Sequence, residues 1–411
     1  MRGGSLATGM MALVASLWPV AVPAEAAGPP MDDGTVASAT AAYRAAYPQM
    51  SESAARTAFD QQLPRKQVYR AAEDTGAFGG SWFDAPSGVL HVAVTAASAA
   101  PSVERVADRL GVSLRVHLVT RSHAALQRQA EAVRTGGDAL SRAAAGHVGI
   151  DVAANQVVVA VPRTARASLG AVPAGVRIVD ATTRASDPDS ACTSRLTCDA
   201  SLRAGTMLRH YGLPICSAGF TARTPGNQRY VYTAGHCDIG PGRWSTGARW
   251  IGPMTSSVRR GPVDAGIIRV DNPSYADDRG GEIYFENADH TVALNDAAPT
   301  MAYLQQGDVV CLAANAAQVN GPNLCGVIGS VSDPAESGMV RVDGVDACTG
   351  DSGGGWYWLA STTYRVAYGL HSDSEPGCHG DSGGSRSWFS PIPEVAAVWG
   401  LTIETRMALT R

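Results

Sequence analysis

Lysine is nearly absent from this 411-residue sequence, and the other scarcities also narrow its class. Lys66 is the one lysine, and arginine supplies the remaining basic residues, which we attribute to genomic base composition rather than to chemistry. Beyond the first residues no segment reaches about 18 uninterrupted apolar residues, so the sequence predicts no membrane-spanning helix. A net charge of −4 gives no reason to expect nucleic acid or an anionic membrane as a partner.

The beginning of the chain has the pattern of an export signal. Arg2 supplies a positive start, residues 10–22 are apolar, and Ala-Glu-Ala at 24–26 fits a cleavage site. An alanine-rich disordered start is the alternative interpretation. We therefore predict a signal peptide over residues 1–27 and a secreted, extracellular protein.

Cysteine is missing from the first 191 residues and then occurs eight times. An even number of cysteines in the later half of an exported chain is typical of disulfides, although spacing alone cannot choose among 105 pairings. A zinc site is disfavoured because no paired C-x-x-C or H-x3-H spacing is present. The cysteines are Cys192, Cys198, Cys216, Cys237, Cys311, Cys325, Cys348 and Cys378.

The length favours two globular units. In the first, residues 28–186, helical patterns over 36–60, 102–110 and 122–145 alternate with two hairpins, which predicts a compact α+β domain. It holds no obvious catalytic cluster. After a linker rich in Ala, Thr, Ser and Asp, residues 187–411 change to glycine, cysteine and short β segments, which predicts an all-β barrel or sandwich.

Three local signals in the second unit belong together. A strand runs into Thr-Ala-Gly-His-Cys at 233–237, Asp264 stands at the mouth of an apolar strand, and Gly-Asp-Ser-Gly-Gly occupies 350–354. Taken singly, the histidine could be structural, the aspartate solvated and the glycine segment a turn. Their occurrence together, in the order His236, Asp264, Ser352, predicts nucleophilic catalysis.

The chemistry requires these residue types. A serine hydroxyl is a poor nucleophile near neutral pH, so a neutral imidazole must accept its proton. A buried carboxylate fixes the imidazole tautomer and stabilises the imidazolium that forms. Glycines beside the serine let backbone N–H groups approach the developing oxyanion, and we assign that role to Gly350 and Ser352.

These motifs resemble those of the chymotrypsin-like serine proteases, in particular the secreted bacterial streptogrisin and α-lytic protease group. Residues 216–220 resemble the mature opening of that group, 388–392 its C-terminal end, and 78–95 its propeptide hairpin. The resemblance implies two packed six-stranded antiparallel β-barrels and a pro-region that assists folding and occupies the site until it is cleaved. It also implies the disulfides Cys216–Cys237, Cys311–Cys325 and Cys348–Cys378, leaving Cys192 to pair with Cys198.

Gly-Asp-Ser-Gly-Gly occurs twice, so the nucleophile must be chosen. Two plausible strands follow Ser352, and this fold needs them to wall the specificity pocket. Only 29 residues follow Ser382, which leaves no room for that hairpin. We therefore assign the nucleophile to Ser352.

The family pattern also suggests the substrate preference. Asp346 stands six residues before Ser352, at the base of the primary pocket, where an aspartate implies a preference for Arg or Lys before the cleaved bond. Ser372 and Ser374 are assigned to the pocket wall. The segment 372–374 lacks the glycine expected there, so an apolar preference is the alternative.

Two features depart from the family. Leu312 stands where the bacterial group has an arginine that pairs with the aspartate corresponding to Asp351, so the sequence identifies no cation for that carboxylate. There is no Ile-Val-Gly-Gly start to bury a new amino terminus, and the activation switch stays open.

The leading hypothesis is a monomeric endopeptidase acting on polypeptides, with its own pro-region as intramolecular inhibitor and with no cofactor or metal. A non-catalytic, protease-like binding protein is the alternative. An esterase is disfavoured because a G-x-S-x-G elbow and the order Ser, Asp, His are missing.

Overall fold

The computed structural model describes residues 33–144, 148–180, 202–246, 249–275, 280–284, 291–315, 324–360, 364–375 and 385–406. The predicted signal peptide, the domain boundary near 186, Cys192, Cys198, Cys378 and Ser382 lie outside these ranges. No helix within them is long and apolar enough to cross a membrane.

The N-terminal region is an α+β unit, as predicted. Its helices are α1 (Asp33–Ala46), α2 (Glu52–Asp60), α3 (Gln62–Asp74), α4 (Ala100–Leu110), α5 (His123–Thr135) and α6 (Ala139–Ala144). The predicted helix over 36–60 is two helices, because the chain turns near Pro48 and Ser51 caps α2 by accepting the Ala54 N–H. The predicted break at residues 136–137 separates α5 from α6.

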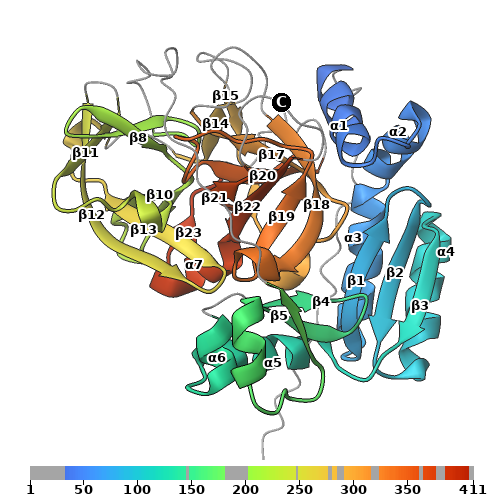
Figure 1. Cartoon of the computed structure of the whole chain (residues 1–411). Helices are drawn as coiled ribbons and strands as arrows, with labels where there is room; N and C mark the ends of the chain where they lie inside the picture. Colours follow the sequence, from blue (N-terminus) through green and yellow to red (C-terminus); the bar gives the residue numbers. More distant parts are fainter. Residues whose placement is uncertain are drawn as a thin grey trace, which may run out of the picture.

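Two small sheets of the same topology complete this region. The first contains β1 (Phe78–Asp84), β2 (Val89–Val94) and β3 (Leu114–Leu118), and the second contains β4 (Val148–Asp151), β5 (Gln156–Val161) and β6 (Val176–Asp180). Each is an antiparallel hairpin, as predicted, joined by a parallel third strand that was not predicted. Figure 1 shows both sheets beside the β-rich region, the first at the right and the second beneath it.

The C-terminal region begins with a largely antiparallel sheet in the order β23-β9-β10-β13-β12-β11-β7-β8. The short strand β23, from the end of the chain, extends one edge, and β8 extends the other. The strands are β7 (Met207–His210), β8 (Leu213–Ser217), β9 (Thr221–Arg223), β10 (Arg229–Thr233), β11 (Arg243–Thr246), β12 (Arg249–Arg260), β13 (Val263–Arg269) and β23 (Thr402–Ile403).

A second sheet closes on itself through pairing of β21 with β22, which gives a six-stranded barrel in the order β21-β20-β17-β18-β19-β22. Its strands are β17 (Val309–Ala313), β18 (Leu324–Asp333), β19 (Met339–Asp343), β20 (Gly355–Leu359), β21 (Arg365–Ser374) and β22 (Arg386–Pro391). Outside the barrel, β16 (Asp296–Ala297) pairs with β21, and β14 (Glu282–Tyr284) pairs with β15 (Thr291–Ala293). Helix α7 (Ile392–Trp399) follows β22. The predicted chymotrypsin-like fold behind an α+β region is thus confirmed, with one correction to the predicted pair of six-stranded barrels. One six-stranded barrel is closed, and we call it the second barrel, whereas the first sheet has eight strands and no pairing among the described residues closes it.

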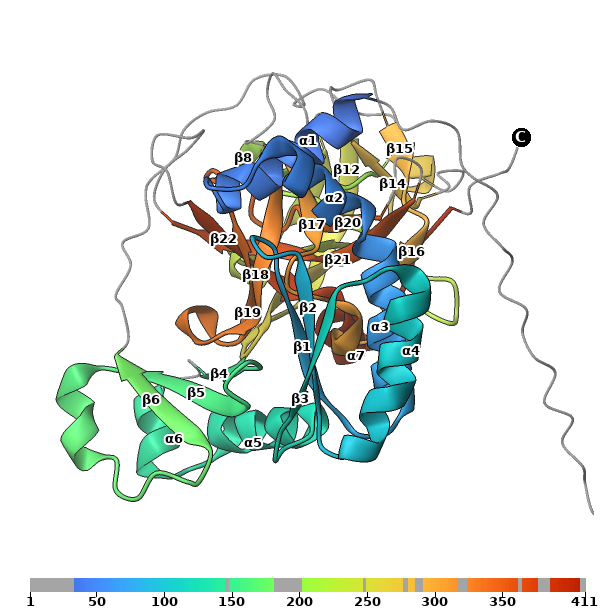
Figure 2. The same cartoon turned by 90° about the vertical axis from the view of Figure 1, so that its right-hand side faces the viewer.

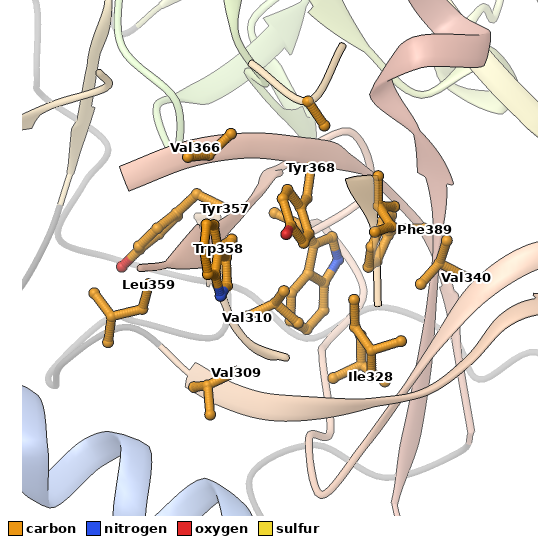
Figure 3. Close-up of a cluster of buried hydrophobic side chains, with 14 of the residues drawn as sticks. Val309, Val310, Ile328, Val340, Tyr357, Trp358, Leu359, Val366, Tyr368 and Phe389 are labelled. Carbon is orange, nitrogen blue, oxygen red and sulfur yellow. The ribbon is translucent and has the colours of Figure 1, made fainter. Parts of the chain in front are cut away.

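Side chains from every strand of this barrel fill its interior. Figure 3 shows Val310, Ile328, Val340, Tyr368 and Phe389 pointing toward one another, and each is fully buried. Burying a Val, Ile or Phe side chain contributes roughly 1.5–3 kcal/mol. The same apolar cluster continues into the N-terminal helices, so the two regions share one core. Figure 2 shows the N-terminal region lying across this face of the barrel.

Candidate active site

His236 is presented by a tight turn at the end of β10. The 3-10 turn Gly235–Cys237 follows the strand directly. A Cβ at Gly235 would lie 2.3 Å from the Val258 carbonyl oxygen, so only glycine lets the turn approach β12 this closely. The disulfide between Cys216 and Cys237, one of the predicted pairs, fastens the turn to the end of β8.

Asp264 lies near the start of β13 and is fully buried. Its Oδ2 lies 2.6 Å from His236 Nδ1, and its Oδ1 accepts the His236 backbone N–H at 2.9 Å. Ser372 donates its hydroxyl to Oδ2 at 2.6 Å. Burial raises the pKa of the Asp264 carboxyl, but the hydrogen bonds and charge of His236, together with Ser372, outweigh burial and hold that pKa below its ordinary value.

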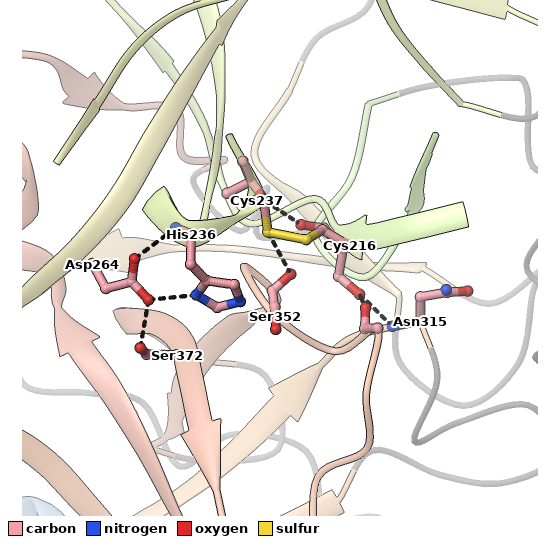
Figure 4. The surroundings of a disulfide bond; sticks show 10 residues. Cys216, His236, Cys237, Asp264, Asn315, Ser352 and Ser372 are labelled. Carbon is pink, nitrogen blue, oxygen red and sulfur yellow. Dashed lines mark hydrogen bonds and ion pairs between the residues drawn. A yellow bond between two sulfur atoms is a disulfide. The ribbon is translucent and has the colours of Figure 1, made fainter. Parts of the chain in front are cut away.

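This arrangement fixes the imidazole. An ionised Asp264 accepts hydrogen bonds only, so His236 Nδ1 must carry a proton and Nε2 is left free to act as a base. In Figure 4 the ring lies between Asp264 and Ser352, with its second nitrogen toward Ser352. No direct hydrogen bond joins Ser352 Oγ to the ring in the described part of the chain. Such bonds are often long in unliganded sites and tighten with substrate.

Ser352 lies in the turn that leads into β20. Its carbonyl oxygen accepts the Ser217 N–H at 2.8 Å, and Gly353 donates its N–H to the His371 carbonyl at 2.8 Å. The Gly353 φ of +84° lies in the region that favours glycine, and a Cβ there would lie 2.1 Å from Thr233 Oγ1. The first sheet and β21 therefore hold the serine turn from both sides.

The two assigned oxyanion donors have no competing acceptor. Among the described residues, neither the Gly350 N–H nor the Ser352 N–H donates a hydrogen bond. Gly350 is oriented by its carbonyl oxygen, which accepts the Ser217 hydroxyl at 2.8 Å. Two unengaged N–H groups beside a serine could stabilise negative charge on a substrate oxygen.

The predicted pocket residues lie in three settings. Asp346 is only 5% exposed, and neither carboxylate oxygen has a hydrogen-bond partner within the part of the chain that is described. Ser372 directs its hydroxyl to Asp264, and the Ser374 hydroxyl lies 3.3 Å from His371 Nε2 and 3.1 Å from Ser387 Oγ. Asp351 is fully buried and accepts the Cys348 N–H at 2.8 Å.

Sequence reasoning missed several supports of this site. Ser390 accepts the Asp264 N–H at 2.8 Å, so a residue of β22 positions the aspartate of β13. His371 is buried behind Ser372 and accepts the Trp356 indole N–H at 3.3 Å. Burial, then the charge of His236, lowers the pKa of His371 to about 3, so this histidine is neutral. No local pattern marks these residues, because their partners are distant in sequence.

The cysteines within the described ranges form disulfides rather than metal sites. Cys216 and Cys237 lie beside His236 with metal-like spacing, but their sulfurs are bonded to each other and so cannot act as thiolate ligands. The predicted pair Cys311–Cys325 is present as well. Cys348 is also disulfide-bonded.

One family model matches part of the N-terminal region. Residues 51–106 match the family model described as the alpha-lytic protease pro N-terminal region. No curated protein sequence matches the chain.

Several solved structures are similar to about half of the chain. They include Nocardiopsis protease (24% identity, 50% of this chain and 100% of that chain, TM-score 0.39) and Thermobifida fusca protease A (26%, 50% and 100%, 0.40). A third is a glutamic-acid-specific serine protease described as using a histidine triad in substrate binding (25%, 49% and 98%, 0.39).

The pro-region match, followed by an eight-stranded sheet and a closed six-stranded barrel, agrees with the predicted resemblance to chymotrypsin-like serine proteases that carry an N-terminal propeptide. More particularly, the pro-region confirms the predicted resemblance to the bacterial α-lytic protease group.

Proposed function

We propose that the chain is the precursor of a secreted endopeptidase whose His236, Asp264 and Ser352 form a catalytic triad. Residues 1–27 are assigned to a signal peptide, 28–186 to the propeptide and 187–411 to the protease. The observation that carries the proposal is the hydrogen-bonded pair of a buried, ionised Asp264 and His236, with the free edge of the ring facing Ser352.

In the proposed reaction, His236 Nε2 takes the proton of Ser352 as Oγ attacks the substrate carbonyl carbon. Negative charge moves to the carbonyl oxygen, which accepts hydrogen bonds from the N–H groups of Gly350 and Ser352. Collapse of the tetrahedral intermediate breaks the C–N bond, and the imidazolium protonates the leaving amine. Water, deprotonated by His236, then hydrolyses the acyl-enzyme and restores the serine.

A serine-directed phosphonate tests this assignment, because the duplicated motif provides a matched control. We expect the matured chain to be labelled on the peptide that contains Ser352, with labelling abolished in Ser352→Ala and kept in Ser382→Ala. The opposite pattern would transfer the nucleophile to Ser382. A folded wild-type chain that takes no label would favour the protease-like binding protein.

For specificity we propose that Asp346 selects Arg or Lys before the cleaved bond. A buried carboxylate with two unpartnered oxygens is costly unless it meets a cation, and a substrate side chain can supply one. We expect Asp346→Asn to lower kcat/KM for arginyl peptides by about 10²–10³-fold while sparing substrates with Leu or Phe at that position. A peptide-library profile of the wild type dominated by Leu, Phe or Tyr would contradict this assignment.

We propose further that the propeptide acts within its own chain as folding assistant and inhibitor, and that the enzyme is monomeric. The contact with the second barrel supports the first part. Tyr43 of α1 donates its hydroxyl to the Gly307 carbonyl at 2.5 Å, and Ile150 of β4 donates its N–H to Ser332 Oγ at 3.2 Å. A Cβ at Gly149 would lie 2.5 Å from the Ser332 carbonyl oxygen, so β4 packs directly on the end of β18.

A further inference from the structure

Lys66, the single lysine of the chain, is buried between the pro-region and the second barrel. It lies on α3, and its side chain is only 4% exposed. The ammonium donates to Asp308 Oδ2 at 2.5 Å and also to the Tyr303 carbonyl oxygen. A buried ammonium pairs with a buried carboxylate here, far along the chain from the catalytic residues.

Three aromatic rings surround the same nitrogen. Lys66 Nζ lies 4.9 Å from the Tyr303 ring centroid, 4.8 Å from that of Trp358 and 5.3 Å from that of Tyr368. Each distance is within the range for cation–π attraction, and several rings around one cation are the usual design of ammonium-binding sites. We call Tyr303, Asp308, Trp358 and Tyr368 the ammonium cage.

The identity of the occupant argues that the cage is selective. Arginine fills 32 of the 33 basic positions of this chain, yet lysine stands at this one. An ammonium is a compact charge with three donors, whereas a guanidinium is a wide planar fork. Gln62, one turn earlier on α3, closes the remaining side: its Oε1 accepts the Val309 N–H at 2.5 Å and the Trp358 indole N–H at 3.1 Å.

The three rings and the carboxylate of the ammonium cage belong to the protease region, whereas the cation and the covering Gln62 come from the pro-region. Removing the pro-region also removes Arg65 and Arg70, whose positive charges disfavour a cation here. Asp308 would remain, with Oδ2 accepting the Tyr368 hydroxyl at 2.9 Å. Its Oδ1 is already buried without a hydrogen-bond partner among the described residues. Once α3 is gone, this carboxylate has lost its ammonium partner, and an incoming cation can take the vacated place.

We propose that the second barrel carries a lysine-binding site separate from the catalytic centre. In the precursor Lys66 fills this site, and in the mature enzyme a lysine side chain of a polypeptide substrate takes its place. The second half of this inference rests on the proposed function, because the site opens only when the pro-region is cleaved away. Trp358 and Tyr368 lie on β20 and β21, the strands that also follow Ser352 and lead to Ser372. Trp358 is six residues after Ser352, and because the chain turns at Gly353 the two residues lie at most about 20 Å apart, so a substrate could engage both sites.

Chemical rescue tests the ammonium cage without any need for proteolysis. In the full chain with Ser352→Ala, Lys66→Ala removes the equivalent of n-propylammonium and should lower Tm. Adding n-propylammonium at ten times its Kd should raise Tm by about 3–6 °C, whereas 1-propanol and propylguanidinium should not. Asp308→Asn in the same background should abolish the rescue. Equal effects of all three additives, or none from the amine, would overturn the selectivity.

The matured wild-type enzyme tests the substrate site. Nα-acetyl-lysine amide should quench tryptophan fluorescence saturably, with at least tenfold weaker binding of Nα-acetyl-arginine amide once an arginyl phosphonate fills the Asp346 pocket. Blocking Ser352 with a phosphonate should leave this binding unchanged. Absence of saturable binding, or loss of binding after the phosphonate block, would overturn the proposal. Failure to mature would refute the proposed function instead, and the rescue experiment would still decide whether the cage selects ammonium.

Discussion

Replacing Asp264 by asparagine gives the sharpest test of the proposed triad. The carboxylate accepts three hydrogen bonds: from the His236 N–H at 2.9 Å, from His236 Nδ1 at 2.6 Å and from Ser372 at 2.6 Å. A carboxamide has one acceptor oxygen and one donor NH2 group. If the oxygen faces Nδ1, the NH2 group meets the His236 N–H. If the NH2 group faces Nδ1, the imidazole proton must move to Nε2.

The second arrangement relieves the clash and removes the base, since a protonated Nε2 cannot accept the proton of Ser352. We expect kcat to fall about 10⁴-fold near neutral pH, equivalent to about 5.5 kcal/mol of transition-state stabilisation, with little change in KM. Ser372→Ala is the graded control. It removes one donor from Oδ2 without changing the tautomer, so a loss of about tenfold is expected.

Each variant precursor is first cleaved to its mature form by tagged wild-type enzyme, which is then removed. The assay measures hydrolysis of a chromogenic peptide amide by the matured variant. Phosphonate titration determines the residual wild-type sites, and thermal unfolding confirms that each variant is folded. Asp264→Asn within tenfold of wild type would refute the tautomer argument. An equal loss of kcat in Ser372→Ala and Asp264→Asn would also refute it, because the carboxylate would then act through Ser372.

Two further predictions follow from the supports of the site. Gly353→Ala should lower the rate of phosphonate labelling at least 10²-fold, because its Cβ would meet Thr233 Oγ1 at 2.1 Å. Gly400 is also at positive φ but has open space around it, so Gly400→Ala should be labelled at the wild-type rate. Equal labelling rates of the two variants would contradict the packing argument. Burial above all lowers the pKa of His371 to about 3. Between about pH 6.5 and 3 the imidazole is therefore protonated in the unfolded chain but neutral in the folded chain. As pH falls through that window, His371 lowers the free energy of unfolding. His371→Gln should therefore shift acid unfolding to lower pH, and an unchanged midpoint would argue against a neutral buried imidazole.

What the sequence alone predicted were features written in short segments. The turns that hold His236 and Ser352 depend on adjacent glycines and cysteines, so their motifs were visible. The hairpins of the pro-region were visible as well, because each needs only two neighbouring strands and a turn. The choice between the two Gly-Asp-Ser-Gly-Gly copies depended on the length of chain that must follow the nucleophile.

What was missed depends on contacts between distant residues. Helix α3 has no side-chain cap at Gln61, and much of its polar face is buried against the second barrel rather than exposed. Strands β3 and β6 pair in parallel with β2 and β5, and each is separated from its partner by an intervening segment of chain. Ser372 and Asp264 are separated by 108 residues, and Lys66 and Asp308 by 242. No periodicity within one segment can report such pairs.

The division of the proposed catalytic residues between the two sheets has a consequence for the producing cell. The proposed acid–base pair belongs to the first sheet and the proposed nucleophile to the second, while Ser372 and Ser390 reach back from the second to orient Asp264. A nascent chain that has left the ribosome only as far as the end of β13 therefore contains an imidazole but nothing for it to activate. Cleavage of neighbouring proteins must wait until synthesis is complete and both halves have docked.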